Sequence, residues 1–171
     1  KLNKLLKLST ITLFAGGLVN PVFANAQEDF SAIMITDQGG VDDKSFNQSA
    51  WDGLQAWGEE NGLERGTDGF DYLESNSDSD YITNLNTAVQ SGFDLIYGVG
   101  FKLEAAISDV SQQYPEQQFA IIDAVVDQPN VASINFKDNE ASFLAGVAAA
   151  STTETDKIGF MGGVEGIVLD R

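Results

Sequence analysis

The chain has 171 residues, 43% of them hydrophobic, which is enough for one compact domain or for part of a larger one. Its 26 acidic residues outnumber its nine basic ones. No nucleic-acid partner is therefore expected, because binding to a phosphate backbone depends on basic patches. Cysteine and histidine are both absent, which excludes disulfides, zinc sites with thiolate or imidazole ligands, and cysteine or serine-histidine catalysis.

Residues 1–26 are typical of an export signal, because Lys1, Lys4 and Lys7 precede an apolar stretch that ends before the small residues 24–26. A buried amphipathic helix is the alternative interpretation. We expect the protein to be exported, to the cell surface or the periplasm. A lipid anchor on an N-terminal cysteine is not expected, because no cysteine follows the signal.

Four short apolar runs follow the signal and are typical of buried strands. They are rich in aliphatic and aromatic residues and are bounded by Gly, Asp or Ser. The predicted strands span residues 30–36, 70–75, 93–100 and 118–125.

The segment after the first strand predicts a helix over about residues 45–61. Its apolar residues recur at steps of four, four and three: Phe46, Ala50, Leu54 and Trp57. This stripe is expected to face a sheet. Ser45 and Gln48 have the spacing of a capping box, and Gly62 is expected to end the helix in a left-handed conformation.

Two more helices are predicted, over about residues 78–91 and 102–114. The first ends at Gly92 and carries three apolar residues on one face: Ile82, Leu85 and Val89. The second ends before Pro115 and carries four: Leu103, Ala106, Ile107 and Val110. Strands and helices thus alternate, which predicts an α/β fold with a doubly wound parallel sheet.

The last part of the chain has a different composition. Residues 131–136 and 157–164 resemble strands, and residues 140–150 predict a helix rich in Ala and Gly. These elements are too few to close a core of their own. We therefore expect residues 27–130 to form a first α/β lobe, and residues 131–171 to form a crossover and the start of a truncated second lobe.

Ligands of a doubly wound sheet bind beyond the carboxyl ends of its strands. That rule selects the polar and glycine residues that follow the predicted strands: Thr36, Asp37, Glu74, Ser75, Gly98, Gly100 and Asp123. The motif ITDQGGVDDKSFNQSAWDG, residues 35–53, begins at the same edge. It combines several carboxylates, two adjacent glycines, an aromatic ring and an amide.

A metal-dependent enzyme is one interpretation of this motif. Calcium-dependent nucleoside hydrolases carry the pattern D-x-D-x-x-x-D-D after their first strand, and Asp42 and Asp43 match its last pair. Thr36 and Gln38 occupy the first two positions and are not carboxylates. Because a hard cation needs six or more oxygen ligands, no metal is expected here.

Recognition of a small ligand without catalysis is the other interpretation. Phe46 could stack on a flat ring while Asn47 and Asp37 bind the edge of that ring. Phe46 could equally be the first core residue of its helix, and the residues alone leave both alternatives open.

Several strings, in this order, resemble the basic membrane protein family of substrate-binding proteins: TDQGGVDDKSFNQSAWDGLQAW, YGVGFKLEAAI, FAIID, NFKDNEASFLAGVAAA and KIGFMGG. Characterised members of that family serve ABC transporters that import nucleosides. The resemblance implies two α/β lobes that close on a ligand, without catalysis and without a cofactor. It also implies a permease partner and a monomeric state. A sugar-type solute-binding or sensory protein of the same fold is the rival.

The resemblance implies ligand-binding roles for six residues: Asp37, Phe46, Asn47, Gly100, Phe101 and Asp123. Phe46 is expected to stack on the base of a purine nucleoside, while the amide and the two aspartates bind the edge of the base or the ribose. Gly98 and Gly100 are expected to let the backbone approach the ligand. Phe101 is a candidate wall of the pocket.

Overall fold

A five-stranded parallel sheet forms the centre of the molecule in the computed structural model, which describes residues 30–163, 165 and 166. The predicted export signal lies outside the described residues. The strands are β1 (Ala32–Ile35), β2 (Phe70–Leu73), β3 (Leu95–Val99), β4 (Gln118–Ile122) and β5 (Val131–Ile134). Their order in the sheet is β2-β1-β3-β4-β5, and every pair is parallel.

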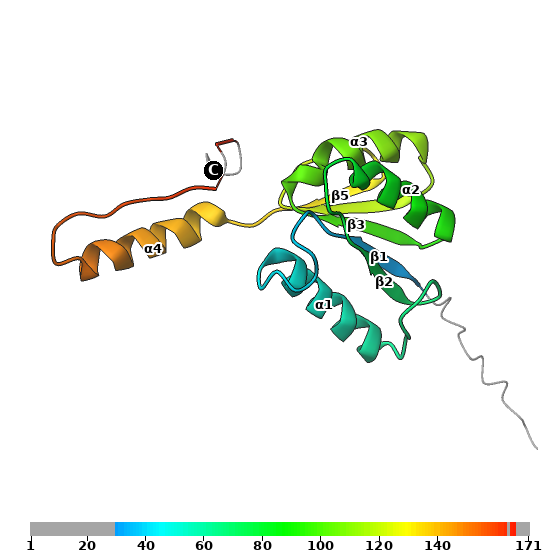
Figure 1. Cartoon of the computed structure of the whole chain (residues 1–171), viewed down its shortest axis with the longest axis horizontal. Coiled ribbons are helices and arrows are strands. Elements are labelled where there is room, and N and C mark those ends of the chain that lie inside the picture. Colours follow the sequence, from blue (N-terminus) through cyan, green and yellow to red (C-terminus); the bar gives the residue numbers. More distant parts are fainter. Residues whose placement is uncertain (1–29, 164, 167–171) are drawn as a thin grey trace, which may run out of the picture.

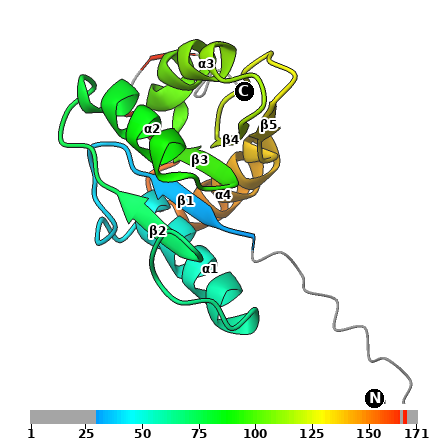
Figure 2. The same ribbon diagram turned by 90° about the vertical axis from the view of Figure 1, so that its right-hand side faces the viewer.

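Helices cover both faces of this sheet (Figures 1 and 2). The helices are α1 (Phe46–Glu60), α2 (Asp80–Ser91), the short 3₁₀ helix η1 (Phe101–Leu103), α3 (Glu104–Gln113) and α4 (Asp138–Thr152), the last of which projects away from the sheet. Helix α1 lies on one face, while α2 and α3 lie side by side on the other. The predicted doubly wound α/β fold is confirmed.

Strand β1 shows why the sheet needs helices on both faces. Ala32 and Met34 belong to the apolar core under α1, whereas Ile33 and Ile35 belong to the core under α2 and α3. All four side chains are buried, so neither face of the strand can be left to solvent. Uninterrupted apolar strands of this kind are typical of parallel sheets.

The two ends of α1 test the predicted caps. At its carboxyl end the prediction is confirmed, because Gly62 has a φ of 69° and the N–H of Leu63 donates to the carbonyl of Gly58 at 2.8 Å. At its amino end the predicted capping box is wrong. The side chain of Ser45 makes no capping hydrogen bond. The carboxylate of Asp43 accepts the N–H groups of Ser45, Asn47 and Gln48 instead.

The predicted apolar faces of α2 and α3 have different outcomes. All four predicted residues near α3 are buried. On α2, however, Ile82 is 46% exposed, and the buried residues are Tyr81, Leu85 and Ala88. These three lie at steps of four and three on one face. Leu85 is therefore buried as predicted and Val89 packs at the margin of the core, whereas the prediction for Ile82 is wrong.

The segment after β5 leaves the sheet (Figure 1). Helix α4 has no buried residue, and its large apolar side chains, such as Phe143 and Leu144, are exposed. The predicted strand over 157–164 is wrong for residues 157–163, which form no strand. A strand needs a neighbour to satisfy its N–H and C=O groups, and none of the described strands lies beside this segment. No described helix is both long enough and apolar enough to cross a membrane.

Two glycines of α1 give a matched test of how closely this helix packs on the sheet. A methyl group on Gly58 would overlap the ring of Phe70, whereas nothing lies within 4 Å of one on Gly53. Gly58→Ala should lower the free energy of unfolding by about 1–3 kcal/mol through overpacking. Gly53→Ala should raise it by about 0.5–1 kcal/mol through the lower chain entropy of the unfolded state. Urea denaturation of both variants checks this, and equal effects would contradict the packing.

Candidate functional site

The order of the strands places a site at the carboxyl edge of the sheet. The chain reverses its direction of winding between β1 and β3, and ligands of doubly wound sheets bind at this point. Asp37, Gly100 and Asp123 follow β1, β3 and β4 there. The N–H of Gly100 donates to the carbonyl of Ile122 at 3.0 Å, and a Cβ on Gly100 would lie 3.7 Å from Asp37 Oδ2. Gly100 therefore lies between the two aspartates.

Asn47 connects this edge to the start of α1. Its side chain is 1% exposed, and its Nδ2 donates to Asp37 Oδ1 at 2.7 Å and to Asp43 Oδ2 at 3.0 Å. Because both acceptors are carboxylates, the orientation of the amide is fixed: the nitrogen must face them. Both N–H groups of the amide are thus occupied within the protein.

Asp37 is left with one free acceptor. Its Oδ1 accepts from Asn47 and from the N–H of Gly39, at 3.1 Å, whereas its Oδ2 accepts no hydrogen bond from the described residues. The side chain is partly exposed, and Oδ2 is the oxygen near Gly100. A ligand with a hydroxyl or N–H group can therefore be bound by Oδ2 without displacing any protein donor.

Asp43 satisfies the first N–H groups of α1. Its Oδ1 accepts from the N–H of Ser45 at 2.7 Å and of Gln48 at 3.1 Å, and its Oδ2 accepts from the N–H of Asn47 at 3.2 Å. Partial burial alone would raise the pKa of Asp43, but these N–H groups outweigh burial and hold the pKa below its ordinary value. Asp43 is consequently ionised and fixed at neutral pH.

Glycines give the loop between β1 and α1 its shape. A Cβ on Gly39 would lie 2.9 Å from the Asn47 Nδ2, so only glycine lets the loop pass this closely over the amide. Gly40 has a φ of 68°, a conformation that glycine adopts without strain. The N–H of Val41 then donates to Glu74 Oε1 at 3.3 Å.

The two candidate aromatic residues lie at the surface. Phe46, the first residue of α1, is 63% exposed, which contradicts the alternative that it is a core residue of its helix. Phe101, the first residue of η1, is 37% exposed. Both elements begin at the carboxyl edge of the sheet, so both rings are available there to a ligand.

The two glycines near the end of β3 have different roles. A Cβ on Gly98 would lie 2.6 Å from Ile107 Cδ1, so the absence of a side chain lets α3 pack on the sheet. The expectation that Gly98 lets the backbone approach a ligand is therefore wrong. Gly100 has a φ of 99°, a conformation that glycine adopts without strain, and it faces Asp37.

Asp123 follows β4 at the same carboxyl edge of the sheet. Asp123 is partly buried, has a φ of 68°, and its N–H donates to the carbonyl of Ile134 at 2.8 Å. Such a φ is uncommon outside glycine and marks a constrained backbone.

Within residues 30–163, 165 and 166, no group of three acidic side chains is placed to hold a metal ion.

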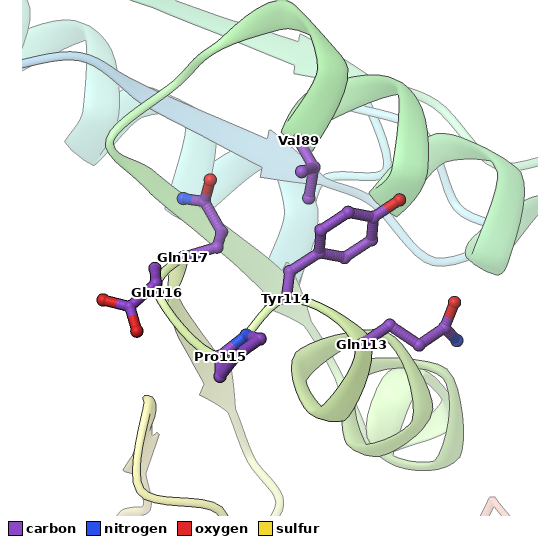
Figure 3. Close-up of a pocket in the computed structure, with 6 residues that line it drawn as sticks. All are labelled: Val89, Gln113, Tyr114, Pro115, Glu116 and Gln117. Carbon is purple, nitrogen blue, oxygen red and sulfur yellow. The ribbon is translucent and has the colours of Figure 1, made fainter.

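A pocket of about 370 Å³ lies at the opposite edge of the sheet (Figure 3). It is formed by Val89 of α2 and by the segment 113–117, which connects α3 to β4. The Tyr114 hydroxyl donates to Asn86 Oδ1 at 3.0 Å, and Gln117 Nε2 donates to the carbonyls of Phe93 and Asp94. This pocket shares none of the six candidate residues.

Sequence reasoning missed the contacts that hold the loop to α2. Gln38 Nε2 donates to Asp78 Oδ1 at 2.8 Å, across 40 residues of sequence. Tyr81, in the first turn of α2, is buried near the same carboxylate. The Gln38 contact has no local signal, because it depends on the parallel pairing of β1 with β2.

Comparison with known proteins matches residues 30–171 to the family profile Bmp, described as "ABC transporter substrate-binding protein PnrA-like". The "CD4+ T-cell-stimulating antigen" of Listeria monocytogenes is 59% identical over 147 residues, which are 85% of this chain and 41% of that protein. The "ABC transporter nucleoside-binding protein BmpA" of Lactococcus lactis is 53% identical over 144 residues, 84% of this chain and 41% of that protein.

A solved structure has the same fold. The ABC transporter solute-binding protein from Aeropyrum pernix matches with a TM-score of 0.64 and 35% identity, over 71% of this chain and 32% of that one. The chain spans about two fifths of the length of the curated relatives it matches.

The hydrogen bonds of Asp43 give a test of how α1 is anchored. Asp43→Ala should lower the free energy of unfolding by about 1 kcal/mol, the typical cost of removing a capping acceptor. Asp42→Ala is the matched control, because Asp42 is exposed and accepts none of these N–H groups, and its effect should stay within about 0.5 kcal/mol.

The lowered pKa of Asp43 also predicts how the free energies of unfolding of Asp43→Ala and Asp42→Ala depend on pH. The stabilisation by this carboxylate is complete above the ordinary aspartate pKa of about 4 and is lost as the pH falls through the lowered pKa of the folded state. The difference between the two variants should therefore be constant near pH 7 and shrink only below about pH 4. Denaturation curves across this range check it, and a difference that is largest in acid would contradict it.

Proposed function

The chain belongs to the Bmp family of PnrA-like ABC transporter substrate-binding proteins, and from this premise we propose that it forms the first lobe of a nucleoside-capturing protein. The ligand is a purine nucleoside, bound between this lobe and a second one and released to a permease. The protein acts outside the cytoplasm as a monomer. It binds its ligand without catalysis and without a metal or another cofactor.

The observation that carries this proposal is the combination of a free carboxylate oxygen and an exposed aromatic ring at one edge of the sheet. Asp37 Oδ2 is an open acceptor for the hydroxyl or N–H groups of a nucleoside. Phe46 offers an exposed ring, and stacking of a base on such a ring contributes about 1–3 kcal/mol. A bare sugar would use the acceptor but not the ring.

The remaining candidate residues have supporting roles in this proposal. Asn47 acts through Asp37, because both of its N–H groups are already donated and only its carbonyl oxygen can accept more. Gly100 keeps the space beside Asp37 open, and Asp123 and Phe101 line the edge on the side of β4 and η1. The name of the Lactococcus lactis relative, a nucleoside-binding protein, supports the same ligand class.

Binding would be coupled to closure of two lobes. Closure excludes water from the ligand, and each hydrogen bond then depends on a partner that is already oriented. The first lobe supplies oriented groups in the ligand-free state, because Asn47 and the N–H of Gly39 hold Asp37 in place. A permease can then distinguish the closed protein from the open one.

The first test is titration calorimetry with a full-length version of the protein that carries both lobes. Inosine, guanosine and adenosine should bind, and ribose should bind much more weakly because it cannot stack. A chelator should leave binding unchanged, and no free base should be released from inosine. Binding that disappears on chelation, or ribose binding as tightly as the nucleosides, would overturn the proposal.

The second test concerns the ring of Phe46 in the same protein. Since the side chain is 63% exposed, Phe46→Ala should cost well below the 3–5 kcal/mol that is typical of a buried phenylalanine. Nucleoside affinity should instead fall by about ten- to a hundredfold, from the loss of stacking. Phe46→Tyr and Phe46→Trp should retain binding. Phe46→Leu, which keeps bulk but has no aromatic face, should not, and a Leu variant of unchanged affinity would exclude stacking.

A further inference from the structure

Tyr81 has a buried hydroxyl at the start of α2. It lies in the first turn of α2, and its side chain, 2% exposed, is part of the apolar core that also contains Ile35 and Leu85. Its hydroxyl oxygen is inaccessible to solvent and has no well-aligned acceptor among the described residues, but the carboxylate of Asp78 is close enough to interact with it. A buried hydroxyl left unpaired would destabilise the fold, so a nearby acceptor is expected to bind it.

The hydroxyl lies among the carboxylates that surround the candidate site. Burial raises the pKa of Tyr81, and the nearby carboxylates of Asp78, Asp37 and Asp80 raise it further. The phenol is therefore a proton donor at neutral pH, in a region that contains mainly acceptors. Asp78 is the neighbour that affects it most.

Asp78 also binds the loop between β1 and α1, which carries Asp37. Its Oδ1 accepts from Gln38 Nε2 at 2.8 Å, and Gln38 directly follows Asp37 in the chain. Gln38 does not occupy Oδ2 of Asp78, which leaves that oxygen available to the phenol. Because the Asp78 side chain is exposed, its carboxylate can rotate toward the phenol without disturbing the core.

We infer that Tyr81 is a positioning residue for the candidate site: its hydroxyl donates to Asp78, and the fixed carboxylate holds Gln38 and thereby the loop that carries Asp37. Tyr81 itself does not touch the ligand. Tyr81, Asp78 and Gln38 thus connect the core of the lobe to the loop between β1 and α1. In this way the start of α2 determines the position of Asp37 and of its free oxygen. The effect on ligand affinity rests on the proposed function, whereas the effect on the loop does not.

The test compares Tyr81→Phe with Tyr114→Phe in the full-length protein. Each variant removes one tyrosine hydroxyl, but that of Tyr114 is bonded to Asn86 at the opposite edge of the sheet. Tyr81→Phe should weaken inosine binding about three- to tenfold. Tyr114→Phe should lower the denaturation midpoint and leave inosine binding unchanged.

Amide hydrogen exchange measures the loop without any ligand. In Tyr81→Phe the amides of Gly39 and Val41 should exchange faster, while those of Ser45 and Gln48, which are held by Asp43, should keep their rates. Unchanged exchange at Gly39 and Val41 would overturn the inference. Faster exchange in a protein that binds no nucleoside would retain the inference and reject the proposed function.

A double-mutant cycle tests whether Tyr81 acts on the loop through Asp78. If the hydroxyl acts through Asp78, the loop amides of Asp78→Ala and of the combined Asp78→Ala and Tyr81→Phe variant should exchange at the same rates. Additive effects of the two substitutions would mean that Tyr81 does not act through this carboxylate, and would overturn the inference.

Discussion

The buried amide of Asn47 is the interaction on which the candidate site depends. It lies between two carboxylates, Asp37 at the end of β1 and Asp43 before α1, and donates one hydrogen bond to each. Without these donors the two like charges would repel each other in a partly buried place. The amide therefore fixes the loop at both ends at once. It also determines which oxygen of Asp37 is occupied and which remains free for a ligand.

The charge at this edge differs from that of sheets that bind phosphate. Helix amino termini usually attract anions there, because their first N–H groups are unpaired. Here Asp43 accepts those of α1, Asp80 accepts the N–H groups of Asn76 and Ser77 before α2, and Glu104 lies in the first turn of α3. An anionic ligand would meet carboxylates rather than free donors. A neutral ligand with hydroxyl and N–H groups, such as a nucleoside, fits these acceptors better.

Sequence periodicity predicted the parallel sheet and its covering helices because burial imposes a local pattern on each element. It failed where the outcome depends on distant parts of the chain. Tyr81 rather than Ile82 faces the core, since the packing of α2 on β1 decides the face. The strand predicted over 157–164 did not form over residues 157–163, because a strand requires a neighbour. The motif located the site, but only the folded loop shows that Asn47 is buried between two acids.

In the proposed function the described lobe supplies one side of the binding surface, and its geometry explains why closure would matter. The ring of Phe46 is mostly exposed, and the free oxygen of Asp37 lies on a partly exposed side chain, so water competes for both. A hydrogen bond formed in contact with water contributes little, because it only replaces one made with the solvent. Stacking on one face of a base likewise leaves its other face in contact with water. Specific affinity therefore requires a second surface that covers the ligand, and the ordered loop reduces the entropy that such closure must overcome.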